Sequence, residues 1–125
     1  MKYKINEIKK YAEDKLQECI DYDDDYLEKD ITEIHNEIFN TDYYIIGTYE
    51  AKQWMGSYAF DIIGYIKDYE MNNFGEIYTE LSDPEKVVNM YVYIIGEEVL
   101  EEVLEEVLEE KNKQNKKTKK QGVNK

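Results

Sequence analysis

The most constraining feature of this sequence is an uninterrupted helical pattern that runs from Ser82 to Glu110. Serine as N-cap, proline in the first turn and glutamate three residues after the serine specify a helix start. At 100° per residue, the apolar residues that follow form two stripes about 150° apart, with Gly96 between them. The first stripe holds Val87, Val88, Tyr91, Val92, Ile94 and Ile95, and the second holds Val99, Leu100, Val103, Leu104, Val107 and Leu108.

A straight helix with one core-facing side does not produce two stripes. The helix therefore either kinks at Gly96 or packs its second half on a different neighbour. The repeated Glu-Glu-Val-Leu unit has a period of four, which drifts by about 40° per repeat against the sense of a left-handed coiled coil, so a leucine zipper is not expected. Two interpretations of Val99–Leu108 stay open: a helix that crosses the domain core, and a self-association or partner surface.

Apolar residues elsewhere recur at steps of three and four, which predicts helices over about 4–20, 27–38 and 48–71. An aspartate of the Asp21–Asp25 run is a candidate N-cap for the second helix, and Thr48 for the third. Gly56 and Gly64 lie eight residues apart on nearly one face, which would admit a close neighbour. We expect a single all-α domain of about four helices with a long C-terminal helix.

The segment Tyr43–Ile46 is ambiguous, because it suits a short buried strand as well as a helical turn. The alternative fold is therefore α+β, with one short strand pair near 43–48 and 76–81.

The charge divides the chain in two. Residues 1–110 hold all 29 carboxylates and nine lysines, which gives −20, and residues 111–125 hold seven lysines and no acid, so that the chain sums to −13. We expect an acidic helical domain over 1–110 and a disordered lysine-rich tail over 111–125, because the tail has almost nothing apolar to bury. The tail is interpreted as a solubilising terminus, with nucleic-acid tethering or a localisation signal as alternatives.

Several functional classes are not expected. No apolar run reaches the roughly 18–20 residues of a membrane span, and the start leads into an amphipathic segment in place of a signal-peptide core. A lone Cys19 fits a reducing cytosol, so we expect a cytoplasmic protein. The negative body, without any arginine, is not expected to bind DNA or RNA directly. Basic protein surfaces or metal ions are the partners that it favours.

The sequence predicts no catalytic residue, no cofactor and no metal site. Asp21, Asp23 and Asp25 resemble the opening of a calcium loop, but Tyr26, Lys29 and Thr32 occupy the positions for glycine and later ligands. His35 has no local metal partners, because the glutamates two positions away point off its helix face. Cys19 is interpreted as a core residue, and a Cys19–His35 pair assembled by the fold stays open.

Two acidic segments are the candidate partner-binding residues. Aspartates and glutamates supply the charge, and tyrosines within the aspartate run supply contact area. The candidates are Tyr22, Asp23, Asp24, Asp25 and Tyr26, with Glu97, Glu98, Glu101, Glu102, Glu105 and Glu106. Eight glutamates over residues 97–110 place one charge per roughly 2.5 Å of helix, against about 1.7 Å for duplex DNA.

Five short segments, at Gly47–Ala51, Ala59–Ile63, Asn73–Glu76, Leu81–Lys86 and Ile95–Glu98, resemble small uncharacterised acidic proteins encoded by bacteriophages and prophages. The resemblance implies a host-directed protein in a bacterial cytoplasm and supplies no functional residues. We therefore expect a non-enzymatic protein that binds a basic surface of a host nucleic-acid-handling protein, with anti-CRISPR or anti-restriction inhibition by partial nucleic-acid mimicry as one instance. The alternative is a structural or assembly module that self-associates, as a possible homodimer, through Val99–Leu108.

Overall fold

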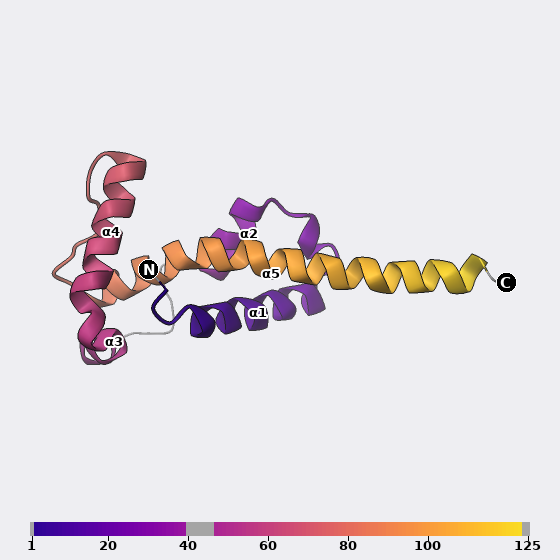
Figure 1. Ribbon diagram of the computed structural model, residues 1–125, viewed down its shortest axis with the longest axis horizontal. Coiled ribbons are helices and arrows are strands. Elements are labelled where there is room, and N and C mark those ends of the chain that lie inside the picture. The colour runs from indigo at the N-terminus through magenta and orange to yellow at the C-terminus, as the bar shows by residue number, and fades with distance from the viewer. Residues whose placement is uncertain (1, 40–46, 124–125) are drawn as a thin grey trace.

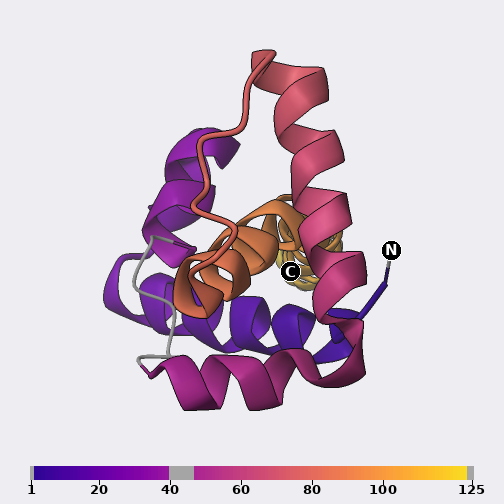
Figure 2. The same cartoon turned by 90° about the vertical axis from the view of Figure 1, so that its left-hand side faces the viewer.

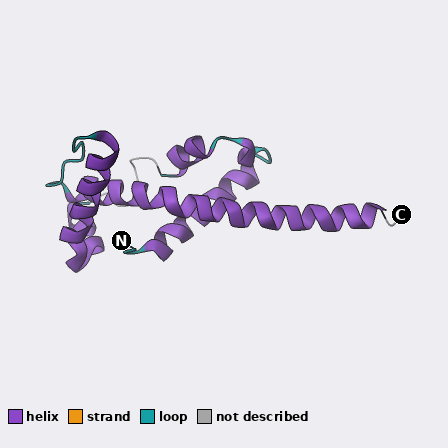
Figure 3. Ribbon diagram, turned by 45° about the horizontal axis from the view of Figure 1, so that its top comes forward, coloured by secondary structure: helices purple, strands orange, loops and turns teal. Residues whose placement is uncertain are grey.

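The computed structural model describes residues 2–39 and 47–123, and within these ranges helices joined by short loops make up the fold, with no strand (Figures 1 and 3). The all-α prediction is confirmed. Residues 76–81, one strand of the α+β alternative, form a loop, and Tyr43–Ile46 lie outside the described residues. The helices are α1 (Ile5–Tyr22), α2 (Ile31–Ile38), α3 (Thr48–Met55), α4 (Ala59–Phe74) and α5 (Pro84–Val123), with 3₁₀ turns at Tyr26–Glu28 and Gly56–Tyr58.

The long helix α5 is the axis of the domain, and the other helices pack around it (Figure 2). α1 runs alongside α5 in the same direction, α2 lies on another side, and α3 and α4 cross the N-terminal part of α5 (Figure 1). Trp54 of α3 and Tyr65 of α4 both place their rings against Tyr91 of α5. Both apolar stripes of α5 are buried apart from Val107 and Leu108, because different neighbours cover the two stripes.

Gly96 lets α2 approach the backbone of α5. A Cβ atom at this position would lie 2.6 Å from the nearest ring atom of Phe39, the residue that ends α2. Phe39 is itself buried, so its ring has little room to move away. The helix α5 continues through Gly96, so the change of face reflects a change of neighbour.

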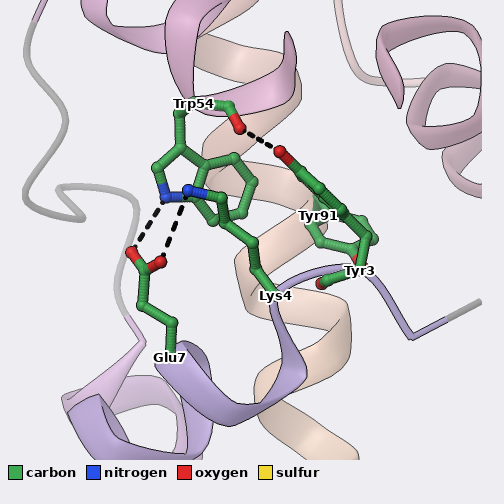
Figure 4. Close-up of polar contacts among 5 residues, drawn as sticks. All are labelled: Tyr3, Lys4, Glu7, Trp54 and Tyr91. Atoms are coloured by element: carbon green, nitrogen blue, oxygen red, sulfur yellow. Dashed lines mark hydrogen bonds and ion pairs between the residues drawn. The ribbon is translucent and has the colours of Figure 1, made fainter. Parts of the chain in front are cut away.

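The N-terminal segment is held by a cluster that joins it to α3 and α5 (Figure 4). The Tyr3 hydroxyl donates to the Trp54 carbonyl, and the Tyr91 hydroxyl donates to the Tyr3 carbonyl at 2.6 Å. The Trp54 indole N–H donates to Glu7 at 3.1 Å, and the Lys4 ammonium lies 4.9 Å from the centre of the Trp54 ring. These contacts fix the start of α1 against the N-terminal half of α5.

The helix ends differ from the predicted ones in three places. Asp30, and not an aspartate of the 21–25 run, caps α2 by accepting from the Thr32 N–H. Asp83, and not Ser82, caps α5, because Pro84 is the first helical residue and the aspartate is directly before it. Gly47 precedes α3, and Thr48 is its first residue.

The helix predicted over 48–71 is two helices, because Gly56 adopts a left-handed φ of 55° and separates α3 from α4. The domain therefore has five α-helices in its described part, one more than expected. Gly64 has no close neighbour among the described residues, since none of them outside its own helix turn places an atom within 4 Å of a Cβ built there. The close approach expected at Gly56 and Gly64 occurs at Gly96 instead.

A buried carboxylate anchors the loop between α4 and α5. Glu70 is fully buried, and its oxygens accept from the Tyr78 N–H at 2.6 Å and the Thr79 N–H at 3.2 Å. Loop amides that lack a helical partner need an acceptor of this kind when they are buried. The contact holds the side chain of Tyr78 at the edge of the domain, beside α5.

At residue 111 the structure has no break in secondary structure, where we expected an ordered body to give way to a tail. Lysine and glutamine have high helix propensity, and α5 continues to Val123. Its last part extends beyond α1 and α2 (Figure 1). Disorder of the lysine-rich segment in solution stays a prediction. No helix of the described chain combines the length and apolarity that crossing a bilayer requires.

The two glycines Gly96 and Gly64 offer a matched test of the α2–α5 packing. Gly64→Ala should raise the free energy of unfolding by about 0.5–1 kcal/mol, because alanine favours the helix and meets no neighbour. Gly96→Ala should lower it by about 1–3 kcal/mol, because the new methyl group collides with the buried Phe39 ring. Urea unfolding followed by circular dichroism measures both. A stabilising Gly96→Ala would contradict the close contact.

Replacement of Glu70 tests the loop anchor. Glu70→Ala should cost about 1–3 kcal/mol of unfolding free energy, because it removes the buried carboxylate that accepts from two loop amides. Hydrogen exchange at the Tyr78 and Thr79 amides should accelerate more than exchange in α1. The exposed Glu76→Ala is the control and should change neither quantity. Unchanged protection of those two amides in Glu70→Ala would show that the anchor is not needed.

Candidate functional site

All eight glutamates at residues 97–110 of α5 are exposed, in two columns. The column that begins at Glu98 faces α1, where the Lys9 ammonium lies 3.1 Å from Glu102 and 3.2 Å from Glu106. These two hydrogen bonds raise the pKa of Lys9. This column is therefore partly neutralised by α1.

The other column begins at Glu97 and faces the opening between α2 and α4. The Tyr69 hydroxyl donates to Glu97 at 3.4 Å, and burial followed by the charge of Glu97 raises the pKa of that hydroxyl. Within the described part of the chain, no hydrogen bond or ion pair reaches the carboxylates of Glu101 or Glu105. Glu101 and Glu105 of this column therefore carry charge with which no lysine of the described residues pairs.

The aspartate run divides into exposed and buried parts. Asp23, Asp24 and Asp25 are exposed, and Tyr22 is 95% exposed. Tyr26, in contrast, is only 4% exposed, and its hydroxyl donates to Glu37 at 2.6 Å. The 3₁₀ turn at Tyr26–Glu28 directs this ring into the core, so Tyr26 is not available as the contact residue that we predicted.

Tyr26 and Glu37 influence each other's ionisation. Burial and the neighbouring carboxylate raise the pKa of Tyr26, whereas hydrogen bonds from Tyr26 and then Lys29 lower the pKa of Glu37. The pair links the turn after α1 to α2 and so holds the exposed aspartates in place.

The fold brings the two predicted acidic segments together. Because α1 and α5 run in parallel, the aspartate run after α1 lies beside the end of the glutamate columns (Figure 1). Asp24 and Leu27 line one open groove with Val107, Glu110 and Lys111 of α5. We use the term acidic surface for Asp23–Asp25 together with the glutamates of residues 97–110.

The predicted self-association face is mostly internal. Val99, Leu100, Val103 and Leu104 are buried in the core of the single chain, beneath neighbours that sequence periodicity does not identify. Val107 is half-buried, and only Leu108 is substantially open to solvent, at 44%. The apolar stripe that suggested a dimer is therefore used within the chain.

Sequence reasoning missed two pockets beside Tyr93. The smaller one has a volume of about 210 Å³ and is lined by residues of α2, α4 and α5. The larger one, of about 670 Å³, lies between the 78–83 loop and the start of α5. The Asn89 Oδ1 atom at the larger pocket is buried and has no hydrogen-bond partner among the residues that the structure describes. The aromatic residues around the end of α4 were the signal in the sequence that could have pointed to the smaller pocket. Its α2 wall could not be foreseen, because the contact of α4 and α5 with α2 depends on tertiary packing.

His35 and Cys19 have separate surroundings. The buried His35 ring shares a hydrogen bond with the Tyr93 carbonyl at 2.9 Å and lies 4.2 Å from the Tyr93 ring centre. Cys19 lies on α1, half-buried beside the hydroxyl of Tyr26. Among the residues that the structure describes, no group of three or more His, Cys, Asp or Glu side chains is arranged to hold a metal ion.

Comparison of the chain with protein-family models, curated proteins and solved structures finds no match. The geometry and charge of the acidic surface and the pockets are therefore the features that bear on function.

Charge removal should distinguish the two glutamate columns. The double variant Glu101→Gln/Glu105→Gln removes three like-charge pairs, each costing about 0.2–0.5 kcal/mol, and should raise the melting temperature at low salt. Glu102→Gln/Glu106→Gln removes the same number of repulsions but also both partners of Lys9, so its gain should be smaller. Thermal unfolding at low and high sodium chloride measures this, and the gains should shrink with screening. Equal gains at low salt would contradict the unequal neutralisation.

Proposed function

We propose that this is a non-enzymatic protein that binds the basic, nucleic-acid-contacting surface of another protein through its acidic surface. The observation that supports this most is the Glu97 column, which is exposed and has no lysine partner among the described residues at Glu101 or Glu105. Repulsion along such a column costs folding stability. A partner with complementary charge would recover that energy on binding.

The density of charge supports a partner that normally binds nucleic acid. Eight glutamates along about 20 Å of helix present one charge per roughly 2.5 Å, of the order of the 1.7 Å spacing of duplex DNA. The aspartates after α1 extend this field at the same end of the molecule. A body with a net charge of −20 also steers a basic partner over a distance of about one Debye length.

The resemblance to phage and prophage proteins suggests the class of partner. A nuclease of a CRISPR or restriction system offers a basic nucleic-acid groove, and occupation of that groove by an acidic protein would block it. Inhibition of host defence by partial nucleic-acid mimicry is therefore one instance of the proposed function. Self-association through Val99–Leu108 is not part of the proposal, because four of these side chains form the core.

The test is affinity capture of partners from bacterial lysate, followed by binding measurements on each purified partner in the presence of competing duplex DNA. We expect the captured proteins to bind nucleic acid, duplex DNA to displace them, and affinity to fall by about tenfold or more between low and moderate salt. Displacement by DNA is the decisive measurement, since it reports a shared surface.

A matched pair of charge variants locates the surface. Glu97→Gln/Glu101→Gln/Glu105→Gln should weaken binding by about tenfold, because it removes neighbouring charges from one column. The control Glu13→Gln/Glu28→Gln/Glu76→Gln removes three exposed charges elsewhere and should have a much smaller effect. Equal losses in the two variants, or partners that DNA does not displace, would reject nucleic-acid mimicry.

A further inference from the structure

The smaller pocket beside Tyr93 joins an aromatic wall to two carboxylates. Tyr69 and Phe74 come from α4, Tyr93 from α5, and Glu97 and Glu101 follow at the next turns of α5. Its volume of about 210 Å³ is below the roughly 300–1,000 Å³ of small-molecule sites and suits one side chain. We call this site the aromatic pocket.

The rings of the aromatic pocket are held in place by their own contacts. Tyr69 and Phe74 meet edge to face, with centres 6.1 Å apart and planes at 80°, and so form a corner. The Tyr93 ring is backed by His35, and its hydroxyl donates to Asn36 at 2.9 Å. Phe74 is nevertheless 52% exposed, which leaves part of an apolar ring in water for an occupant to cover.

The charge of the aromatic pocket selects the occupant. Glu97 and Glu101 are one turn apart on α5, and the described residues lining the pocket include no lysine. Two carboxylates beside aromatic faces attract a cation, which gains both ion pairing and cation–π contact. An apolar or acidic side chain would leave the carboxylates unpaired.

From this geometry we infer that the aromatic pocket receives an arginine side chain of the partner protein. A guanidinium is planar, stacks on aromatic rings and donates to carboxylates through a fixed fork, whereas an ammonium is compact and strongly hydrated. The apolar part of the side chain would pack against Ile31 and Leu100, which also line the pocket. This chain contains no arginine, so the occupant comes from another molecule.

The inference depends on the proposed function and deepens it. Basic nucleic-acid grooves are rich in arginine, because arginine is the usual bidentate reader of phosphate and guanine. The acidic surface would supply attraction at a distance, and the aromatic pocket would fix one arginine at short range. The two roles are separable, since a small arginine peptide tests the pocket without the partner.

The test is a titration of the isotope-labelled full chain with a blocked Gly-Gly-Arg-Gly-Gly peptide, followed by amide NMR. We expect saturable shifts at Tyr69, Phe74, Tyr93 and Glu97, with weak affinity in the millimolar range. The matching lysine peptide should bind about threefold or more weakly. The citrulline peptide, which keeps the shape of arginine but has no charge, should give no saturable shift.

Two variants and their controls locate the binding. Phe74→Ala should weaken the arginine peptide by about fivefold, whereas Phe60→Ala, at an 88% exposed ring elsewhere on α4, should leave its affinity unchanged. Glu97→Gln/Glu101→Gln should weaken it by about tenfold, whereas Glu105→Gln/Glu109→Gln removes the same charge further along α5 and should change it less than about twofold. Because glutamine keeps the shape of glutamate, the Glu97→Gln/Glu101→Gln variant still tests the pocket if Phe74→Ala does not fold.

The outcomes separate the two proposals. Shifts spread over the whole acidic surface without saturation, equal binding of the lysine or citrulline peptide, or equal losses in the variants and their controls would overturn the arginine pocket. A partner that DNA displaces would still support the acidic surface in that case. Saturable arginine binding in the pocket, with no partner displaced by DNA, would support the pocket and reject the mimicry.

Discussion

The contact between the Phe39 ring and the backbone of Gly96 is the constraint on which the rest of the structure depends. It brings α2 against α5 at Gly96, the residue where the apolar side of α5 changes direction. The first half of α5 can then pack on α3 and α4 while the second half packs beside α1. Since both apolar stripes are buried in this way as far as Leu104, one helix supplies much of the core, and the glutamates on it face solvent.

Local sequence signals predicted much of this fold. The three- and four-residue spacing located α1, α2 and α5, and the Glu-Glu-Val-Leu repeat placed the glutamates in two columns because both properties follow from helix geometry alone. The errors have a common cause. Whether Ser82 or Asp83 caps α5, and whether Gly56 continues a helix or ends one, depends on a backbone conformation that several residue types permit.

The candidate site was predictable only where it lies on one element. The acidic surface was visible in the sequence because its charges lie on α5 and in one adjacent run. The burial of Tyr26 was not visible, and the sequence left open whether Val99, Leu100, Val103 and Leu104 cross the core or form a contact surface, since both outcomes depend on which helices cover them. The aromatic pocket was the least accessible to sequence reasoning, because its residues come from α2, α4 and α5 and only the fold brings them together.

The two parts of the surface differ in range, and this difference favours a division of roles. Exposed carboxylates act over about a Debye length, but they do not distinguish one basic protein from another and are screened by salt. Rings held by Tyr69–Phe74 and His35–Tyr93 contacts act only at contact distance, and they favour one shape of cation. Because Glu97 begins the column and also lines the pocket, the pocket lies at one end of the acidic surface that would attract the proposed partner. An acidic helix alone would give attraction without selectivity, whereas this arrangement links the two through one residue.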